Sequence, residues 1–190
     1  MNGRKGVIAA GLAALLVGAL RAETPPLQAA AMAQDPQPES DIKAAFLPKF
    51  AMFTTWPESV FAGAGDEFRI GVLGPDSALE PVERVLRGIK VGTRTVKVLR
   101  GATAAEIKDC PLVFIHASEK ERFAEHLLVL RTLPVLTVGE SEGFAQGGGI
   151  LNFYVEQNRV KFEINPEAAA RAGLKVTKLV GVAPRKVKDP

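Results

Sequence analysis

The stretch Cys110-Pro111-Leu112-Val113-Phe114-Ile115-His116 places four consecutive apolar residues between a proline and a polar exit. A short run that is apolar at every position suits a strand covered on both faces, because a solvent-exposed face would carry alternating polar residues. We therefore predict a central parallel strand at 112–115. Such a strand requires helices on both sides of one sheet.

The chain before this strand alternates between strand and helix patterns. Residues 68–73 and 95–99 have the composition of strands, and residues 78–87 and 103–106 have the apolar spacing or the end signals of helices. A longer helix is predicted upstream, from near Ser40 to Trp56-Pro57, with Pro48 expected to kink it or divide it in two. Its apolar stripe consists of Ile42, Ala45, Phe46, Phe50 and Phe53.

The chain after the central strand continues this alternation and then changes pattern. Ser118 and Glu121 form a capping-box signature for a helix that ends near Arg131, with Phe123, Leu127 and Leu130 on its buried side. A strand is predicted at 135–138, and two later segments, 151–155 and 160–164, alternate as a hairpin. A further helix is predicted at 167–172, whereas 174–182 fits a helix or a strand. The predicted fold class is α/β: three layers, with a mostly parallel sheet flanked by helices and an antiparallel C-terminal hairpin.

The N-terminus has the pattern of an export signal. Arg4 and Lys5 precede an uncharged apolar run, and Ala31-Met32-Ala33 fits the small-residue rule for signal cleavage. Cleavage nearer Ala22, or retention as an uncleaved anchor, stays open. We predict a signal peptide at 1–33, a flexible lead-in at 34–40, one domain at 41–182 and a basic, solvated tail at 183–190.

The composition excludes several classes of protein. The chain has 190 residues, of which 47% are hydrophobic and 24% charged, so it can bury a core. The chain has 24 basic and 21 acidic residues, and without residues 1–33 these counts become 21 and 20. Cationic residues cluster only in the tail, so we do not expect the protein to bind nucleic acid. Two histidines and one cysteine supply a metal site poorly, and no nucleotide-binding glycine motif is complete, so no metal and no cofactor are predicted. Cys110 is predicted to be unpaired.

Two residues after the central strand are candidates for ligand binding. His116 ends the strand and Ser118 starts a helix signal, at the place where open α/β sheets bind ligands. Trp56 could stack on the same ligand. The alternative interpretation has Ser118 as a helix N-cap, His116 as a partly exposed strand end and Trp56 in the core. His126, among charged residues of the next helix, is expected on a solvated face.

One face of the predicted hairpin is polar. A sheet edge of this kind can meet another protein, or it can simply be solvated. The residues on this face are Asn152, Tyr154, Glu156, Arg159, Lys161 and Glu163.

The order of several segments resembles the YfiR/HmsC-like periplasmic proteins over residues 40–182. The segments are AFLxxFxxFxxWP from position 45, RIxVLG from 69, CPLVFI from 110, PVLTV from 134, GFAxGGxIxNF from 143, and FEIN from 162 followed by AGL at 172–174. The resemblance implies a non-catalytic regulator in the periplasm of a Gram-negative bacterium, which binds the periplasmic part of an inner-membrane diguanylate cyclase and holds it inactive. Restraint of cyclic-di-GMP synthesis, exopolysaccharide production and biofilm formation would follow.

The polar hairpin face and the C-terminal segment are the expected contact surface for that partner. The expected contact residues are Tyr154, Lys161, Glu163, Leu174 and Lys178. Relatives can carry paired cysteines, and this chain has Gly71 where a cysteine often stands, so the resemblance implies that Cys110 is half of a lost pair. A homodimer is left open.

Two alternatives from other functional classes are also left open. One is a periplasmic small-molecule receptor, with Trp56, His116 and Ser118 lining a pocket and feeding a histidine kinase or a transport system. The other is a hydrolase that uses His116 and Ser118, although the G-x-S-x-G surroundings of such a nucleophile are missing.

Overall fold

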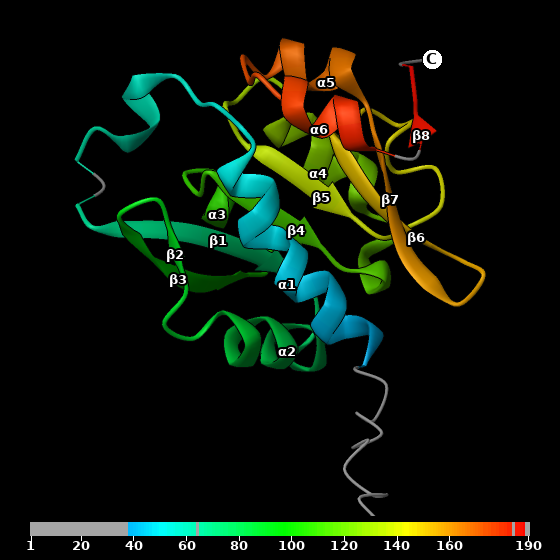
Figure 1. Ribbon diagram of the computed structural model, residues 1–190, viewed down its shortest axis with the longest axis horizontal. Helices are drawn as coiled ribbons and strands as arrows, with labels where there is room; N and C mark the ends of the chain where they lie inside the picture. Colours follow the sequence, from blue (N-terminus) through cyan, green and yellow to red (C-terminus); the bar gives the residue numbers. More distant parts are fainter. Residues whose placement is uncertain (1–37, 64, 184, 189–190) are drawn as a thin grey trace, which may run out of the picture. The chain divides into compact units, whose positions relative to one another are not determined.

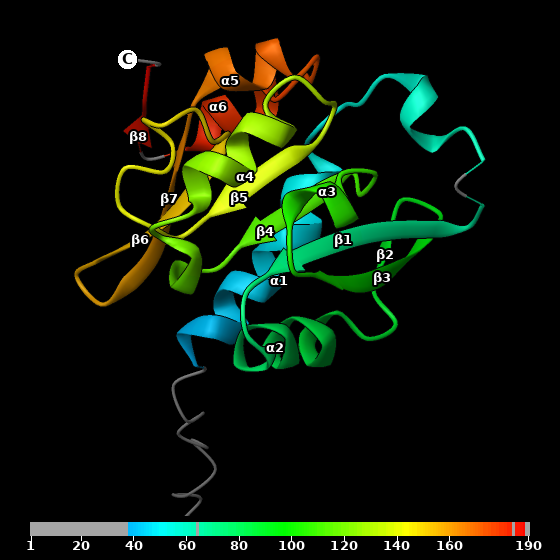
Figure 2. The ribbon, with the colours of Figure 1, turned by 180° about the vertical axis from the view of Figure 1, so that it is seen from behind.

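The computed structural model describes residues 38–63, 65–183 and 185–188. The predicted signal peptide, 1–33, lies outside the described residues, as does most of the predicted lead-in. The described part of the chain forms an eight-stranded sheet with helices on both faces (Figures 1 and 2). The predicted α/β class, with three layers and a mostly parallel sheet, is confirmed.

The strands are β1 (Glu67–Leu73), β2 (Lys90–Val91), β3 (Arg94–Gly101), β4 (Leu112–Ile115), β5 (Leu136–Gly139), β6 (Leu151–Glu156), β7 (Arg159–Ile164) and β8 (Arg185–Lys186). The α-helices are α1 (Glu39–Met52), α2 (Asp76–Leu86), α3 (Ala104–Ile107), α4 (Phe123–Leu130), α5 (Pro166–Arg171) and α6 (Thr177–Val182). Two short 3-10 helices are η1 (Glu58–Phe61) and η2 (Ala117–Glu119).

The strand order is β2-β3-β1-β4-β5-β6-β7-β8. Strands β3, β1, β4, β5 and β6 run parallel, and the predicted antiparallel hairpin is the pair β6–β7. From β1 the chain passes through α2 to β3 on one side, and from β3 through α3 to β4 on the other side of β1. The connections therefore diverge between β1 and β4, which is where an open α/β sheet leaves a crevice at its carboxyl edge.

Strand β4 shows why the sheet needs two covers. Leu112 and Phe114 belong to one buried core with α1, α2, α5 and α6, while Val113 and Ile115 belong to the second core with α3 and α4. Successive side chains of a strand point to opposite faces, so a strand that is apolar throughout fits only between two helical layers. The prediction of a central strand at 112–115 is confirmed.

Helix α1 packs its aromatic residues against the hairpin. The Phe50 ring lies 5.5 Å from the Phe153 ring and 5.0 Å from the Phe162 ring, and Phe46 contacts the same two rings. Phe53 does not share this burial, because it follows the last turn of the helix and is 46% exposed. The helix also continues through Pro48 as one element that begins at Glu39, so the two-piece alternative is wrong.

The glycine-rich loop after β5 is shaped by one buried ring. Phe144 is fully buried, and a Cβ placed on Gly139 or Gly149 would lie 2.4 Å or 2.1 Å from its ring atoms. The ring therefore occupies space that side chains at these two positions would need. This packing leads the chain from the end of β5 back into β6.

The C-terminal segment is more ordered than the sequence predicts. Residues Thr177–Val182 form a helix, α6, which resolves the ambiguity between helix and strand in favour of the helix. Arg185 and Lys186 of the predicted basic tail form β8, which pairs with β7 in parallel register, and both residues are exposed. Among the described residues, no helix has the length and hydropathy needed to cross a membrane.

Candidate functional site

The three predicted ligand-binding residues do not form one pocket. Trp56 donates a hydrogen bond from Nε1 to the Pro111 carbonyl, 3.2 Å away, so it lies at the amino end of β4. His116 and Ser118 follow the carboxyl end of the same strand. Trp56 packs edge-on against Phe61 and Phe68, which fits the alternative interpretation of a core residue.

His116 belongs instead to a polar cluster at the carboxyl edge of the sheet. Its Nε2 lies 3.3 Å from Oε1 of Glu140, which directly follows the neighbouring strand β5. Glu140 also accepts hydrogen bonds from the Ala117 amide at 2.9 Å and from Nζ of Lys43 at 2.6 Å. The Glu140 side chain is only 7% exposed, and these three donors compensate the burial of its charge.

Lys43 connects this cluster to helix α1. Burial alone would lower the pKa of Lys43, but hydrogen bonds and ion pairs with Glu140 and Glu39 outweigh it, so the pKa is raised. The ammonium group therefore stays charged between its two carboxylates. Sequence reasoning missed this cluster because Lys43 and Glu140 are 97 positions apart. The available signal was that Glu140 comes two positions after the predicted strand 135–138, as His116 comes directly after the predicted strand 112–115.

A cleft of about 440 Å³ lies beside the cluster, between the N-terminal parts of α1 and α2. Lys43, His116 and Glu140 form its polar side. Its apolar side consists of Ala44, Ala78, Pro81, Val82 and Phe114. The cleft lies at the carboxyl ends of β1 and β4, where the chain leaves the two strands toward opposite sides of the sheet. This is the usual position of ligand sites in open α/β sheets.

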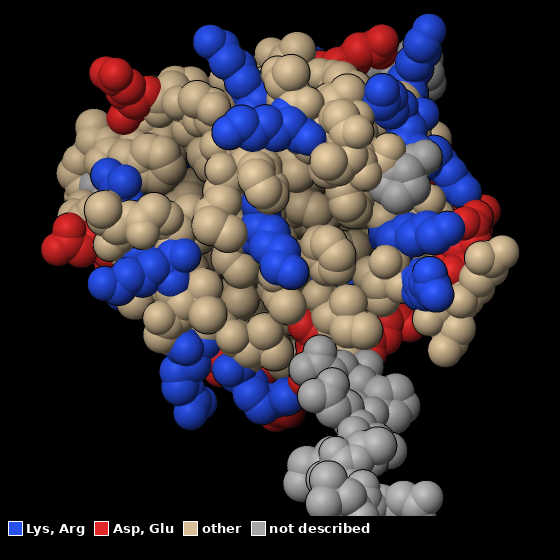
Figure 3. All heavy atoms as spheres, in the orientation of Figure 1, with Lys and Arg blue, Asp and Glu red and all other residues tan. Residues whose placement is uncertain are grey.

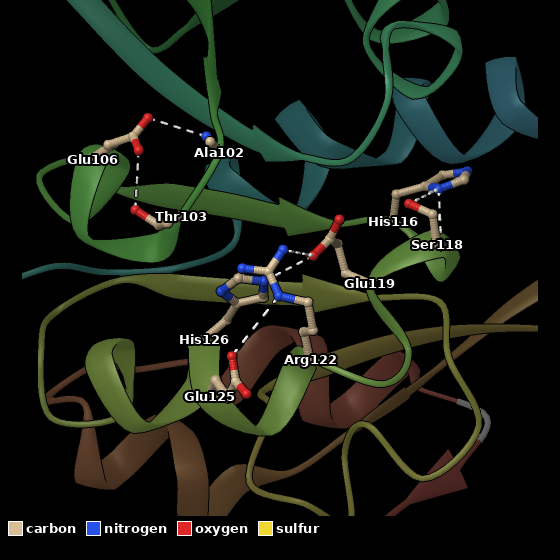
Figure 4. Close-up of polar contacts among 9 residues, drawn as sticks. All are labelled: Ala102, Thr103, Glu106, His116, Ser118, Glu119, Arg122, Glu125 and His126. Carbon is tan, nitrogen blue, oxygen red and sulfur yellow. Dashed lines mark hydrogen bonds and ion pairs between the residues drawn. The ribbon is translucent and has the colours of Figure 1, made fainter.

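Ser118 and His116 contact each other, but their geometry is a local turn. His116 Nδ1 accepts the backbone N–H of Ser118 at 3.1 Å and lies 3.0 Å from its hydroxyl oxygen (Figure 4). An imidazole nitrogen has one lone pair, so the backbone donor competes with any hydroxyl proton for it. This arrangement favours a turn around η2 over a nucleophile and its base. Ser118 does not cap α4, whose N-cap is Arg122.

His126 is a buried member of a second charged cluster. Its side chain is 4% exposed, and its Nε2 lies 3.0 Å from Oε2 of Glu119. Arg122 reaches the same carboxylate at 3.3 Å (Figure 4). The predicted solvated position is therefore wrong, since the helix turns His126 inward and η2 supplies its carboxylate partner.

The polar hairpin face carries a partly buried network. Glu163 is 3% exposed, accepts a hydrogen bond from Asn152 Nδ2 at 3.1 Å, and lies 3.5 Å from Arg185 of β8. Arg185 also stacks over the Tyr154 ring, 4.3 Å from its centre. Lys161 pairs with Glu156 and lowers the pKa of that carboxyl group. Tyr154 and Lys161 are partly exposed, whereas Glu163 is covered and cannot be a surface contact.

Leu174 and Lys178 lie on the other side of the sheet. Leu174 is 4% exposed and packs in the core that contains α1, so it is not a surface contact. Lys178 is exposed on α6, which covers the face opposite to Tyr154 and Lys161. The five predicted contact residues therefore do not form one surface.

Cys110 is buried beside Ile107 and Val113 in the smaller core. Burial raises the pKa of its thiol to about 11, which makes the group a weak nucleophile at neutral pH. It is free. Gly71 cannot accept a side chain without movement, because a Cβ there would lie 2.8 Å from Ile107 Cδ1. Among the described residues, no three metal-ligating side chains gather at one point.

The sequence matches the YfiR/HmsC-like family over residues 40–183. The chain belongs to this family. YfiR-like proteins are in general periplasmic, and the family is associated with the regulation of diguanylate cyclases. The matched range includes the His116–Glu140–Lys43 cluster and the β6–β7 hairpin, so both are parts of the family's domain.

No curated protein matches the chain at a significant level. Two solved structures show distant likeness: the ABC domain in complex with L-Trp from Streptococcus pneumonia, at 12% identity, and a conserved domain protein from Vibrio cholerae, at 10% identity. Each has a TM-score of 0.49 and covers 63% of this chain. The YfiR-like chain spans 55% of the length of either structure.

Proposed function

We propose that this YfiR-like chain is an exported negative regulator that binds the periplasmic part of an inner-membrane diguanylate cyclase. It acts by preferring the inactive state of that enzyme, because a binding protein shifts an equilibrium only through its different affinities for two states. Cyclic-di-GMP synthesis, exopolysaccharide production and biofilm formation fall as a result. The regulator itself makes and breaks no covalent bond.

Family membership is the observation that carries this proposal. The β6–β7 hairpin supports it, because its tip extends beyond the helices that cover the rest of the sheet (Figures 1 and 2). We assign the contact to its polar face, with Tyr154 and Lys161 as its partly exposed residues. Arg185 stacks on Tyr154, so the rigid aromatic side chain is held in place before the partner binds.

The test is deletion of the gene in its own bacterium, with intracellular cyclic-di-GMP as the measurement. The level should rise on deletion and return when the wild-type chain is restored. A chain carrying Lys161→Glu should fail to restore it. Lys97→Glu is the matched control, because Lys97, like Lys161, is a strand lysine paired with a glutamate, Glu67, and lies on β3 at the far side of the sheet.

An unchanged cyclic-di-GMP level after deletion would contradict the regulatory function. Equal behaviour of Lys161→Glu and Lys97→Glu would remove the hairpin from the contact surface while leaving the function in place. Capture of the full-length membrane cyclase by the tagged chain, measured for the same two variants, separates lost binding from lost expression.

A second function, sensing of a small molecule, is favoured by the cleft beside His116 and Glu140. A ligand bound there would contact α1 and α2 together and could control the regulator. A thermal-shift screen with nucleotides, amino acids and vitamins tests this. A ligand at 100 times its dissociation constant adds about 2.7 kcal/mol of stability. The shift should disappear in Glu140→Gln.

A further inference from the structure

One face of the domain combines exposed lysines with exposed apolar side chains. Met52, the last residue of α1, is 54% exposed, the following Phe53 is 46% exposed, and Val182 on α6 is 67% exposed. Monomeric proteins seldom leave several large apolar side chains uncovered near one another, and such groups mark interaction sites. We call this surface the lysine face, and it consists of Lys49, Met52, Phe53, Lys175, Lys178 and Val182.

Helix geometry and one backbone bridge bring these residues together. Met52 and the C-cap residue Phe53 come three and four positions after Lys49 of α1, so the three residues share the outer side of the helix end. Thr55 and Lys175 exchange backbone hydrogen bonds of 2.9 Å and 3.0 Å, which fixes the start of the α6 segment beside the end of α1. Lys178 and Val182 then share the exposed side of α6.

The charge on this side of the molecule is positive. Figure 3 shows lysine and arginine side chains over its middle, whereas the acidic side chains lie toward its margins. The chain has a net charge of +3, and from residue 34 onward it has 21 basic and 20 acidic residues, so the cations on this face do not follow from a strongly basic composition. They mark one direction in which an anionic surface is attracted.

The residue types distinguish between the possible occupants. A second copy docked around a two-fold axis would place lysines of one protomer against lysines of the other, and like charges oppose that contact. Protein interfaces are also depleted in lysine and enriched in arginine, tyrosine and tryptophan. Lysines around phenylalanine and methionine are instead typical of surfaces that lie on lipid, where long lysine side chains reach the headgroups and apolar side chains enter the boundary.

We propose that the lysine face binds the anionic phospholipid surface of a membrane. This docking goes beyond the proposed regulation and does not depend on the identity of the partner enzyme. Tyr154 and Lys161 project from the opposite face of the sheet, so a membrane-bound domain keeps its hairpin surface free. Membrane docking would confine the regulator to the plane in which a membrane enzyme diffuses.

The test is sedimentation with lipid vesicles. It uses the purified chain with the N-terminus that it has when it is recovered from cells. Vesicles of phosphatidylcholine alone are compared with vesicles containing about one-third phosphatidylglycerol. The chain should bind the anionic vesicles more tightly at about 0.1 M salt, and should lose most of this difference at about 1 M salt, because screening shortens the range of charge attraction.

Variants locate the contact on the chain. Each lysine near an anionic surface contributes about a fivefold change in partition, so Lys49→Ala with Lys175→Ala should weaken binding by about 25-fold. Phe53→Ser should weaken binding and leave the salt dependence unchanged, because it removes only apolar contact. Lys108→Ala with Lys120→Ala is the matched control, since it removes the same charge from exposed positions at the ends of α3 and η2.

Equal binding to both kinds of vesicle, or an equal loss in the control double variant, would overturn the proposal. A dimer that is disrupted by Phe53→Ser, without vesicle binding, would assign the face to a second copy. Loss of cyclase capture in Lys49→Ala with Lys175→Ala, again without vesicle binding, would assign it to a protein. All variants share one N-terminus, so an apolar leader cannot produce the differences between them.

Discussion

The substitution Glu163→Ala tests how the hairpin face is held together. Glu163 is buried, and its carboxylate is the acceptor for Asn152 Nδ2 and the partner of Arg185. The Asn152 Oδ1 atom is already buried without a hydrogen-bond partner. Removal of the carboxylate would therefore leave both ends of one buried amide unsatisfied.

The expected loss of stability follows from these contacts. Removing the acceptor and so leaving the buried donor of Asn152 unpaired costs about 1–3 kcal/mol. The pair with Arg185 adds less than about 1 kcal/mol, because the Arg185 side chain is 51% exposed. Relief from burying the carboxylate charge offsets part of the loss. We expect Glu163→Ala to lower the free energy of unfolding by about 2 kcal/mol.

Urea unfolding of wild type, Glu163→Ala, Arg185→Ala and Glu67→Ala measures this effect. Glu67 is the control carboxylate, since it pairs with Lys97 on the surface and its removal should cost less than about 0.5 kcal/mol. Arg185→Ala should fall between the two. If Glu163→Ala were no less stable than Glu67→Ala, the network would not hold the hairpin, and the surface assigned to the partner would lose its rigid support.

Three further predictions concern the core and the cluster. The pKa of Cys110 is raised from 9.0, the ordinary thiol value, to about 11, so between these pH values only the thiol of the unfolded chain ionises. The contribution of Cys110 to the free energy of unfolding should therefore be constant below pH 9.0 and fall between pH 9.0 and about 11. Cys110→Ala should remove this fall from urea midpoints measured against pH. Glu140→Ala should lower the free energy of unfolding by about 3 kcal/mol, because Lys43 loses a buried partner; Glu142→Ala, an exposed neighbour, serves as the control in the same titration. Gly139→Ala should cost about 3 kcal/mol because its Cβ meets the Phe144 ring; in a double variant with Phe144→Leu the two losses should be less than additive, and full additivity would mean that the ring is not the obstacle.

The sequence predicted the elements whose pattern depends on local burial. Strand 112–115 and the hairpin were predictable because their residue patterns are regular, continuously apolar in β4 and alternating between apolar and polar in β6 and β7. The alternation did not show that Asn152 and Glu163, on the polar face, are buried. The helix stripe was predicted one turn too far, since the aromatic spacing includes Phe53 although the buried part of α1 ends at Ala51 and the helix itself ends at Met52. The spacing of apolar residues identifies the buried face of a helix, but it does not show at which residue the burial ends.

The candidate site was less predictable, because its contacts join distant parts of the chain. His116 was identified from its place after a strand, but its contact with Glu140 depends on strand order. The contact of Glu140 with Lys43 depends on where α1 crosses the sheet. Trp56 was grouped with His116 although the length of β4 separates them. Glu163 was predicted to be a surface residue, but Arg185 of β8 lies against it. Strand β8 was not predicted, because its two residues are both charged and have no strand pattern.

Strand β8 has a practical consequence for work with this chain. It closes part of the outer edge of β7, whose backbone groups would otherwise be open to pairing with another molecule. Truncation before Arg185, or a fusion partner that pulls the last residues away, would leave a longer bare edge and favour aggregation. Affinity tags on this protein therefore belong at a distance from Lys186, joined through a long flexible spacer.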